Sequence, residues 1–212
     1  MTDTRTVVSI PKDLVAEMPL VTYPGCITIV DTPELADKAL DEILSCSVVG
    51  FDTETKPAFR KGKTNNVALM QVSGEDRCWL FRVNRLGVDG AVKRFLENDA
   101  ILKVGLSIKD DFFVMHRSAE FEPKGFVDLQ SYVKEFKIAD ASLQRIFAIL
   151  FGKRISKGQR LSNWEADSLT EAQQHYAAID AWACLRIYNL LSAGEFDPMS
   201  SPYLTEIIEN KE

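Results

Sequence analysis

The chain has 212 residues, of which 46% are hydrophobic and 26% charged, and its formal net charge is −6. This composition is typical of a soluble globular protein and excludes disordered, collagen-like and coiled-coil classes, and one domain of this length buries about 70% of its unfolded surface. The acidic balance argues against a protein that coats nucleic acid through bulk positive charge.

The four cysteines form no C-x-x-C pair and share no spacing, so the sequence indicates neither a zinc ribbon nor a redox motif, and we expect free thiols. Residues 1–10 carry charges and lack the apolar region of a signal peptide. No stretch approaches the roughly eighteen uncharged apolar residues that a membrane span needs. We therefore expect a cytoplasmic protein without membrane attachment.

The first elements alternate between helix and strand. A short helix is expected over residues 11–18 and a strand over residues 26–30. Thr32 followed by Pro33 is typical of an N-cap and a first helical residue, so a second helix should begin there and end near Ser45.

Three strand-like runs follow, at residues 47–53, 66–73 and 77–83. They are rich in β-branched, aromatic and leucine residues, and a turn at 74–76 separates the last two. The pattern predicts a meander of neighbouring antiparallel strands.

The second half of the chain predicts a helix at about 87–97, a strand at 100–105, a helix at 109–116 and a short strand around Val127, before several further helices. The longest helix should span 170–191, because it begins close to a capping-box sequence and contains neither glycine nor proline.

These elements indicate an α/β fold with a mixed sheet covered by helices. We divide the chain into an N-terminal arm (1–25), a main domain (26–193) and a C-terminal tail (194–212) that we expect to be loosely attached, since Gly194 and Pro198 end the long helix.

Two carboxylates lie at the end of the first meander strand. Asp52 and Glu54 are two residues apart, so in a strand both side chains project to the same face. Two like charges buried there would be costly unless a cation lay between them. Since Mg²⁺ and Mn²⁺ prefer carboxylate oxygens, the pair indicates a metal site, although a solvated strand end could carry the same residues.

Further acidic residues could complete such a site. Asp110 and Asp111 lie where a strand passes into a helix, and spacing alone does not choose between them. In the longest helix, Tyr176 and Asp180 are four residues apart and therefore lie on one face. An aspartate among apolar residues needs a partner, either a basic side chain or a metal ion.

Three segments occur in a fixed order: Phe51-Asp52-Thr53-Glu54-Thr55, then residues 105–111, then Tyr176-Ala-Ala-Ile-Asp180-Ala. Together they resemble the three exonuclease motifs of the DEDD superfamily. Residues 66–73 and 161–173 are also similar to the exonuclease domains of the Werner-syndrome helicase and ribonuclease D. The resemblance covers most of residues 27–191 and implies a ribonuclease H-like mixed sheet flanked by helices, with metal-dependent 3′→5′ removal of nucleotides.

The resemblance also implies roles for individual residues. The ligands of two divalent ions, Mg²⁺ or Mn²⁺, would be Asp52, Glu54, Asp111 and Asp180. Asp111 is preferred to Asp110 because the family places its aspartate six residues after a glycine that matches Gly105. Asp52 would bridge both ions. Glu54 and Asp180 would complete the first site, and Asp111 would hold the second ion largely through water.

The superfamily divides by the residue that positions the attacking water: a tyrosine four residues, or a histidine five residues, before the last aspartate. Tyr176 and His175 satisfy both spacings. In a helix of about 3.6 residues per turn, Tyr176 lies about 40° from Asp180 around the axis and His175 about 140°. We therefore expect Tyr176 to orient the water with Glu54, and His175 to lie at the surface.

Positive charge is concentrated in segments 56–63 and 145–160, which together carry +9 without an acidic residue and leave −15 on the rest of the chain. Phosphate contacts from such segments would give sequence-independent, salt-sensitive binding. The candidate nucleic-acid contacts are Arg60, Lys61, Lys63, Lys157, Arg160 and, through stacking on a base, Trp164.

The sequence thus favours a metal-dependent 3′→5′ exonuclease that acts on single-stranded or 3′-recessed DNA or RNA. A catalytically silent nucleic-acid-binding module of the same fold is the alternative, and a phosphoesterase for small molecules is a third hypothesis. All four carboxylates and the tyrosine are present, which argues against a silent module. The sequence does not choose between DNA and RNA, and it identifies no protein partner.

Overall fold

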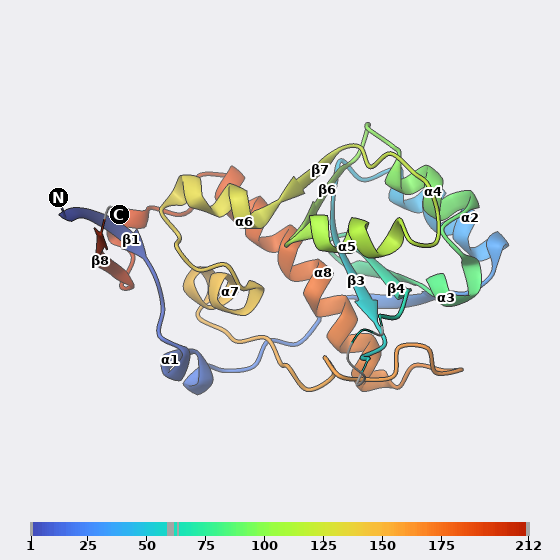
Figure 1. The fold of residues 1–212 in the computed structure, drawn as a ribbon, viewed down its shortest axis with the longest axis horizontal. Helices are drawn as coiled ribbons and strands as arrows, with labels where there is room; N and C mark the ends of the chain where they lie inside the picture. The colour runs from blue at the N-terminus through green and yellow to red at the C-terminus, as the bar shows by residue number, and fades with distance from the viewer. Residues whose placement is uncertain (1, 59–61, 63, 211–212) are drawn as a thin grey trace.

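A six-stranded mixed sheet forms the centre of the computed structural model (Figure 1), which describes residues 2–58, 62 and 64–210. The strand order is β2-β5-β4-β3-β6-β7. The strands are β2 (Cys26–Val30), β3 (Val48–Thr55), β4 (Val67–Ser73), β5 (Arg77–Phe81), β6 (Leu102–Gly105) and β7 (Phe126–Asp128). Strands β3, β4 and β5 pair antiparallel, whereas β2 pairs with β5, β6 with β3 and β7 with β6 in parallel. The expected meander and mixed sheet are confirmed.

Helices cover both faces of this sheet. They are α1 (Lys12–Glu17), α2 (Pro33–Ile43), α3 (Val83–Leu86), α4 (Gly90–Leu96), α5 (Ile108–Met115), α6 (Leu129–Tyr132), α7 (Leu143–Phe151) and α8 (Glu171–Ser192), with 3-10 turns η1 (Val133–Phe136) and η2 (Pro198–Ser200). Helices α2, α4 and α5 pack on one face and α7 and α8 on the other, which gives two hydrophobic clusters. In the described chain, no helix is both long and apolar enough to cross a membrane.

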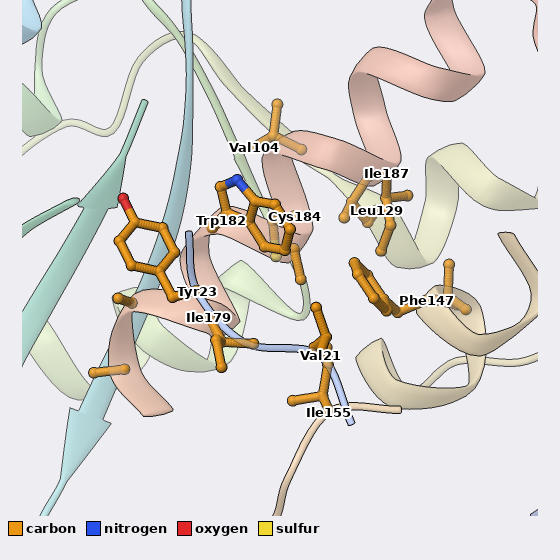
Figure 2. Packing of buried hydrophobic residues seen from close by; sticks show 14 of the residues in the cluster. Val21, Tyr23, Val104, Leu129, Phe147, Ile155, Ile179, Trp182, Cys184 and Ile187 are labelled. Atoms are coloured by element: carbon orange, nitrogen blue, oxygen red, sulfur yellow. The ribbon is translucent and has the colours of Figure 1, made fainter. Parts of the chain in front are cut away.

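Helix α8 organises the second cluster and runs through the middle of the molecule (Figure 1). Its first turn is held by the predicted capping box, in which Thr170 and Gln173 each bond the other's backbone N–H. Figure 2 shows Trp182 of this helix near Val104 of β6, Ile187 near Phe147 of α7, and Ile179 beside Tyr23. The helix therefore joins the sheet to α7, and burial of these apolar side chains is its main source of stability.

The boundaries of several strands differ from expectation; β6, for example, was expected from residue 100 and begins at Leu102. The run predicted to end at Val83 stops at Phe81, and the chain turns at once into α3. The Arg82 N–H still donates to the Val30 carbonyl of β2 at 2.8 Å, and the Arg82 guanidinium donates to the Ala166 and Asp167 carbonyls, so this residue ends the strand and ties it to residues 166–167. Strand β3 extends two residues beyond the predicted Thr53, and a register irregularity between Glu54 and Thr55 marks its end.

The prediction of a loosely attached C-terminal tail is wrong. Strand β8 (Leu204–Asn210) pairs antiparallel with β1 (Thr2–Val8), which gives a separate two-stranded sheet at one end of the molecule (Figure 1). The two termini are held together over seven residue pairs, from Thr2 with Asn210 to Val8 with Leu204. Backbone pairing between segments so far apart in sequence leaves no local signal, which is why the pattern of the tail alone did not indicate it.

Candidate active site

Three carboxylates converge at the end of the central strand β3. Asp52 and Glu54 lie on β3 and Asp180 on α8, and one oxygen from each lies within 4.8 Å of the others. Asp180 is only 8% exposed, and the other two are half-buried. Strand spacing brings the first two to one face, as the sequence predicted, and the packing of α8 supplies the third.

A glycine allows α8 to approach this strand. A Cβ atom on Gly50 would lie 1.9 Å from the carbonyl oxygen of Ala181, so helix backbone and strand backbone are in direct contact there. Ala177, Ala178 and Ala181 are fully buried on the helix. Small residues on both elements therefore bring Asp180 close to Asp52.

Asp111 lies at the edge of the same cluster. It is half-buried on α5 and accepts a hydrogen bond from the Thr53 hydroxyl, whereas Asp110 is exposed. Ser107 begins α5 with left-handed backbone, φ 59°, and its N–H donates to Asp128 at 3.1 Å. Thr53 and Asp128 thus fix the turn and the side chain that bring Asp111 toward the β3 carboxylates.

Tyr176 lies one turn before Asp180 on α8. Its hydroxyl donates a hydrogen bond to the Asp180 carboxylate, and burial raises the pKa of the phenol above its usual value, so the group stays protonated. His175 is 45% exposed and lies 3.7 Å from Glu171, one turn earlier. The structure therefore brings Tyr176 to the carboxylates, and leaves His175 largely in solvent.

The four carboxyl groups perturb one another. Burial, followed by the charge of Asp180, raises the pKa of Glu54 to about 8, and burial raises the pKa of Asp111 and of Asp180 each to about 7. The pKa of Asp52 also rises well above its usual range, through burial and then repulsion by the neighbouring carboxylates. So many acids at one place are favourable only with bound protons or cations.

The cluster faces a cleft of about 570 Å³. Asp52, Tyr176 and Asp180 line one part of it, and Lys157 and Arg160 line another. Arg160 lines the same cleft as Asp52 and Asp180, and its charge lowers the pKa of Glu54, against the larger effect of burial, which raises it. Lys157 and Arg160 therefore line the same cleft as the carboxylates, and their contact with a phosphate strand stays a prediction.

The other predicted nucleic-acid contacts fare differently. Arg60, Lys61 and Lys63 lie outside the described residues. The prediction that Trp164 stacks on a base is wrong for this conformation, because its side chain is fully buried, with its ring centroid 6.0 Å from that of Tyr176. Because the indole ring packs against Tyr176 of α8 and is buried, neither water nor a nucleic-acid base can contact it.

Two arginines of the predicted basic segment 145–160 have structural partners. Arg145 lies 2.6 Å from the buried carboxylate of Asp140, and the Nε of Arg154 donates to the Met18 carbonyl at 2.8 Å. Counting charges along the sequence could not separate these side chains from Lys157 and Arg160, because both arginines also donate to backbone carbonyls of the N-terminal arm, Ile10 for Arg145 and Met18 for Arg154, which are remote in sequence.

Several residues of the cleft were not singled out from the sequence. Beside the cleft, Thr53 carries the one available signal, its place between two acidic residues, whereas Asp128 ends an inconspicuous short strand. Ser142, Gln144 and Cys184 also line the cleft. Serine, glutamine and cysteine at these positions fit ordinary helical patterns, so only the tertiary structure identifies them.

The donor set fits a hard divalent cation. All the converging groups are carboxylates, and none is the imidazole or thiolate that softer metals prefer. Burial raises their pKa values and so favours the protonated form when no cation is bound. A cation with oxygen ligands would relieve their repulsion. The fold and the site together define a ribonuclease H-like domain with a cluster of carboxylates suited to a divalent cation.

Solved structures share this architecture. The EXO domain of Aedes aegypti Nibbler has a TM-score of 0.69 at 23% identity, over 82% of this chain and 92% of that chain. Ribonuclease D of Trypanosoma brucei, solved in complex with the RNA U12, has a TM-score of 0.71 at 18% identity, over 84% of this chain and 68% of that chain. These neighbours confirm the predicted ribonuclease H-like fold.

The sequence comparisons identify the family. A family model described as 3′-5′ exonuclease matches residues 27–193, and the chain belongs to this family. The bifunctional 3′-5′ exonuclease/ATP-dependent helicase WRN of Mus musculus is 36% identical over 186 residues, which are 82% of this chain but only 13% of that protein. The chain thus spans a small part of that relative, and its match is to a 3′-5′ exonuclease domain.

Proposed function

We propose that this chain hydrolyses the terminal phosphodiester bond at the 3′ end of single-stranded or 3′-recessed nucleic acid and so removes nucleotides one after another. The convergence of Asp52, Glu54 and Asp180 beside Tyr176, in a cleft that also contains Lys157 and Arg160, carries the proposal. A silent binding module would have no need for four carboxyl groups whose pKa values are raised by burial and mutual repulsion, because such an arrangement costs stability.

Asp52, Glu54, Asp111 and Asp180 would hold two divalent ions, Mg²⁺ or Mn²⁺. When bound, the ions supply activation of a water molecule and neutralise charge on the scissile phosphate and leaving 3′ oxygen. The carboxylates would position the ions: β3 and α8 bring Asp52, Glu54 and Asp180 together, and α5 brings Asp111 to the edge of this cluster.

Tyr176 fits the tyrosine branch of the superfamily. Because its hydroxyl donates to Asp180, the oxygen of that hydroxyl is left to accept a hydrogen bond from water. Glu54 offers a second acceptor on the neighbouring element. Together they can fix the direction of an attacking water molecule, while Lys157 and Arg160 bind the phosphate strand.

The test is a time course on 5′-labelled single-stranded DNA and RNA with Mg²⁺, with Mn²⁺ or with EDTA. We expect a ladder that shortens from the 3′ end and disappears in EDTA. Binding of either polymer without cleavage under any metal would support the silent module instead. Equal rates on nucleotide esters and on oligonucleotides would support a small-molecule phosphoesterase.

A further inference from the structure

A second cleft of about 460 Å³ lies between α1 and α7. Figure 1 shows α1 beside α7, on the side of the molecule opposite α2 and α4. The charged and apolar side chains that form its walls include Lys12, Val15, Arg145, Arg154, Ile155 and Lys157. None of the described residues lining it is acidic, although the chain as a whole carries −6. The cleft is therefore a locally basic site in an acidic protein.

The N-terminal arm forms one wall of this cleft, and it is pinned in place on both sides of α1. Before the helix, the Ile10 N–H donates to the Asp140 carboxylate at 2.9 Å, and Arg145 donates to the Ile10 carbonyl at 2.8 Å. After the helix, the Arg154 N–H donates to the Pro19 carbonyl at 3.0 Å. The wall is thus part of the folded structure, held by groups that are remote in sequence.

The two arginines of the cleft are largely engaged in this anchoring, but the two lysines are not. Lys12 and Lys157 are exposed, and within the described chain neither makes an ion pair. They project from α1 and from the segment after α7, so the cleft has a free ammonium group on each side. Such paired, flexible cations suit a polyanionic strand better than a single compact anion.

The second cleft is continuous with the carboxylate cleft. Ser142, Gln144 and Lys157 line both. A strand whose 3′ end lies at Asp52 and Asp180 can therefore pass along Lys157 and then between α7 and α1 without leaving the protein surface.

We propose that the α1–α7 cleft binds the phosphodiester backbone upstream of the scissile bond, an inference that rests on the proposed function. The chemistry of the substrate fixes the direction. The terminal nucleotide ends in a 3′ hydroxyl, so the scissile phosphate is the last phosphate of the strand. A lysine ammonium group that lies away from the carboxylate cluster can therefore contact only phosphates on the 5′ side of the scissile bond.

The contacts in this cleft carry no base readout. Lysine ammonium groups bind phosphate without regard to sequence, and Val15 and Ile155 offer apolar contact to sugars or bases of any kind. The site should therefore raise affinity for longer strands uniformly across sequences.

Lys12→Glu tests the proposal, with Lys38→Glu as the matched control, because Lys38 is an exposed lysine on α2 outside both clefts. Each variant is assayed on a dinucleotide, which has only the scissile phosphate, and on a single strand of about ten nucleotides. For Lys12→Glu we expect the ratio of kcat/KM on the long strand to that on the dinucleotide to fall about fivefold or more at low salt. On the long strand, the slope of log KM against log salt concentration should become shallower by about one.

Lys12→Gln, which removes the charge without reversing it, should give a smaller change in the same direction, and Lys38→Glu should leave the ratio at its wild-type value. An unchanged ratio in Lys12→Glu, with a wild-type protein that shortens the long strand, overturns the upstream site alone. Equal losses on both substrates also overturn it, because they place the effect at the metal centre or in the fold. If the wild-type protein cleaves neither substrate, the proposed function itself fails.

Discussion

The carboxylates at the end of β3 are placed for chemistry at the expense of stability. Asp52, Glu54 and Asp180 lie within 4.8 Å of one another, and their raised pKa values reflect burial and mutual repulsion. A carboxylate that repels its neighbours but would hold a metal ion should be dispensable for folding and indispensable for activity. That separation can be measured one side chain at a time.

Asp180→Asn should abolish hydrolysis, with a loss in kcat of at least about a hundredfold, because the amide is a poor ligand for a divalent ion. The melting temperature of the metal-free variant should equal or exceed that of the wild type, since one repelling charge is gone. Cleavage of a 5′-labelled strand and thermal unfolding in EDTA measure the two effects.

Asp110→Asn is the control for this variant, because it removes an exposed carboxylate next to Asp111 without touching the cluster. It should keep wild-type kcat. Full activity in Asp180→Asn, or in Asp52→Ala, would sink the metal-site assignment.

Tyr176→Phe removes the hydroxyl that donates to Asp180 and leaves the ring packed as before. We expect kcat to fall about tenfold to a hundredfold with little change in KM, because the group orients water rather than binding the strand. Single-turnover kinetics at saturating metal would measure the chemical step directly.

His175→Ala tests the competing spacing. The histidine is largely exposed and faces Glu171, so its loss should change kcat by less than about twofold. A larger loss in His175→Ala than in Tyr176→Phe would reverse the assignment and place the protein in the histidine branch of the superfamily.

At the scale of elements, the decisive contact is between β3 and α8. The strand carries two acids and the helix the third, so the distance between the two backbones sets the geometry of the site. Gly50 controls this distance, because a Cβ there would lie 1.9 Å from the Ala181 carbonyl oxygen. The atoms that this Cβ would meet are the Ala181 backbone and the Leu185 Cβ, which cannot move aside unless the whole helix moves.

Gly50→Ala should therefore lower both stability and activity. Displacement of α8 should cost about 2 kcal/mol or more of unfolding free energy and reduce kcat by moving Asp180 away from Asp52. Chemical denaturation and the strand-shortening assay would follow the two losses together.

Gly74→Ala is the matched control, since its added Cβ would meet its nearest neighbours at 3.7 Å or more and its backbone is not left-handed. It should change neither quantity appreciably. A fully stable and active Gly50→Ala would show that α8 can retreat without moving the metal ligands.

Most elements were predictable because their signals are local. Strand β2 begins and ends where expected, and the N-cap of α2 and the capping box of α8 are observed at Thr32 and Thr170. The turn into α3 and the pairing of β1 with β8 were not predicted. The pairing leaves no local signal, because the partner of the N-terminal strand lies far along the chain, at residues 204–210.

At the scale of the whole molecule, folding is linked to protons and divalent cations. The unfolded carboxyls have ordinary pKa values near 4, whereas the folded pKa is about 8 for Glu54 and about 7 for Asp111 and Asp180. At pH values between the unfolded and the folded pKa of these groups, the folded state binds more protons than the unfolded state. The free energy of unfolding of the metal-free protein therefore falls as pH rises through this window.

In EDTA, we expect the protein to be less stable at pH 8 than at pH 5.5 by at least about 1 kcal/mol. Addition of Mn²⁺ or Mg²⁺ should restore stability, and more so at pH 8, because cations then compete with fewer protons for the carboxylates. Melting temperatures at the two pH values, with and without metal, measure this linkage.

Asp52→Asn serves as the comparison, because loss of one charge should make the pH dependence in EDTA shallower. The interpretation would fail if metal-free stability rose steadily from pH 5.5 to pH 8 in the wild type. Other titrating groups contribute equally to both proteins, so the difference between their slopes reports the cluster.

The sequence by itself predicted the mixed sheet, most of its strands and the longest helix, and it placed Asp52 with Glu54 and Tyr176 with Asp180 on shared faces. These depend on hydrophobic period, capping residues and spacing, all of which act over a few neighbours. Only the tertiary structure decided that Trp164 is buried, that Arg145 and Arg154 anchor the N-terminal arm, and that the tail completes a sheet. It also decided that α1 and α7 enclose a basic cleft next to the carboxylate cluster. The reason is that burial and partnership of a charged or aromatic side chain depend on residues brought near by the fold, and those residues are distant in the chain.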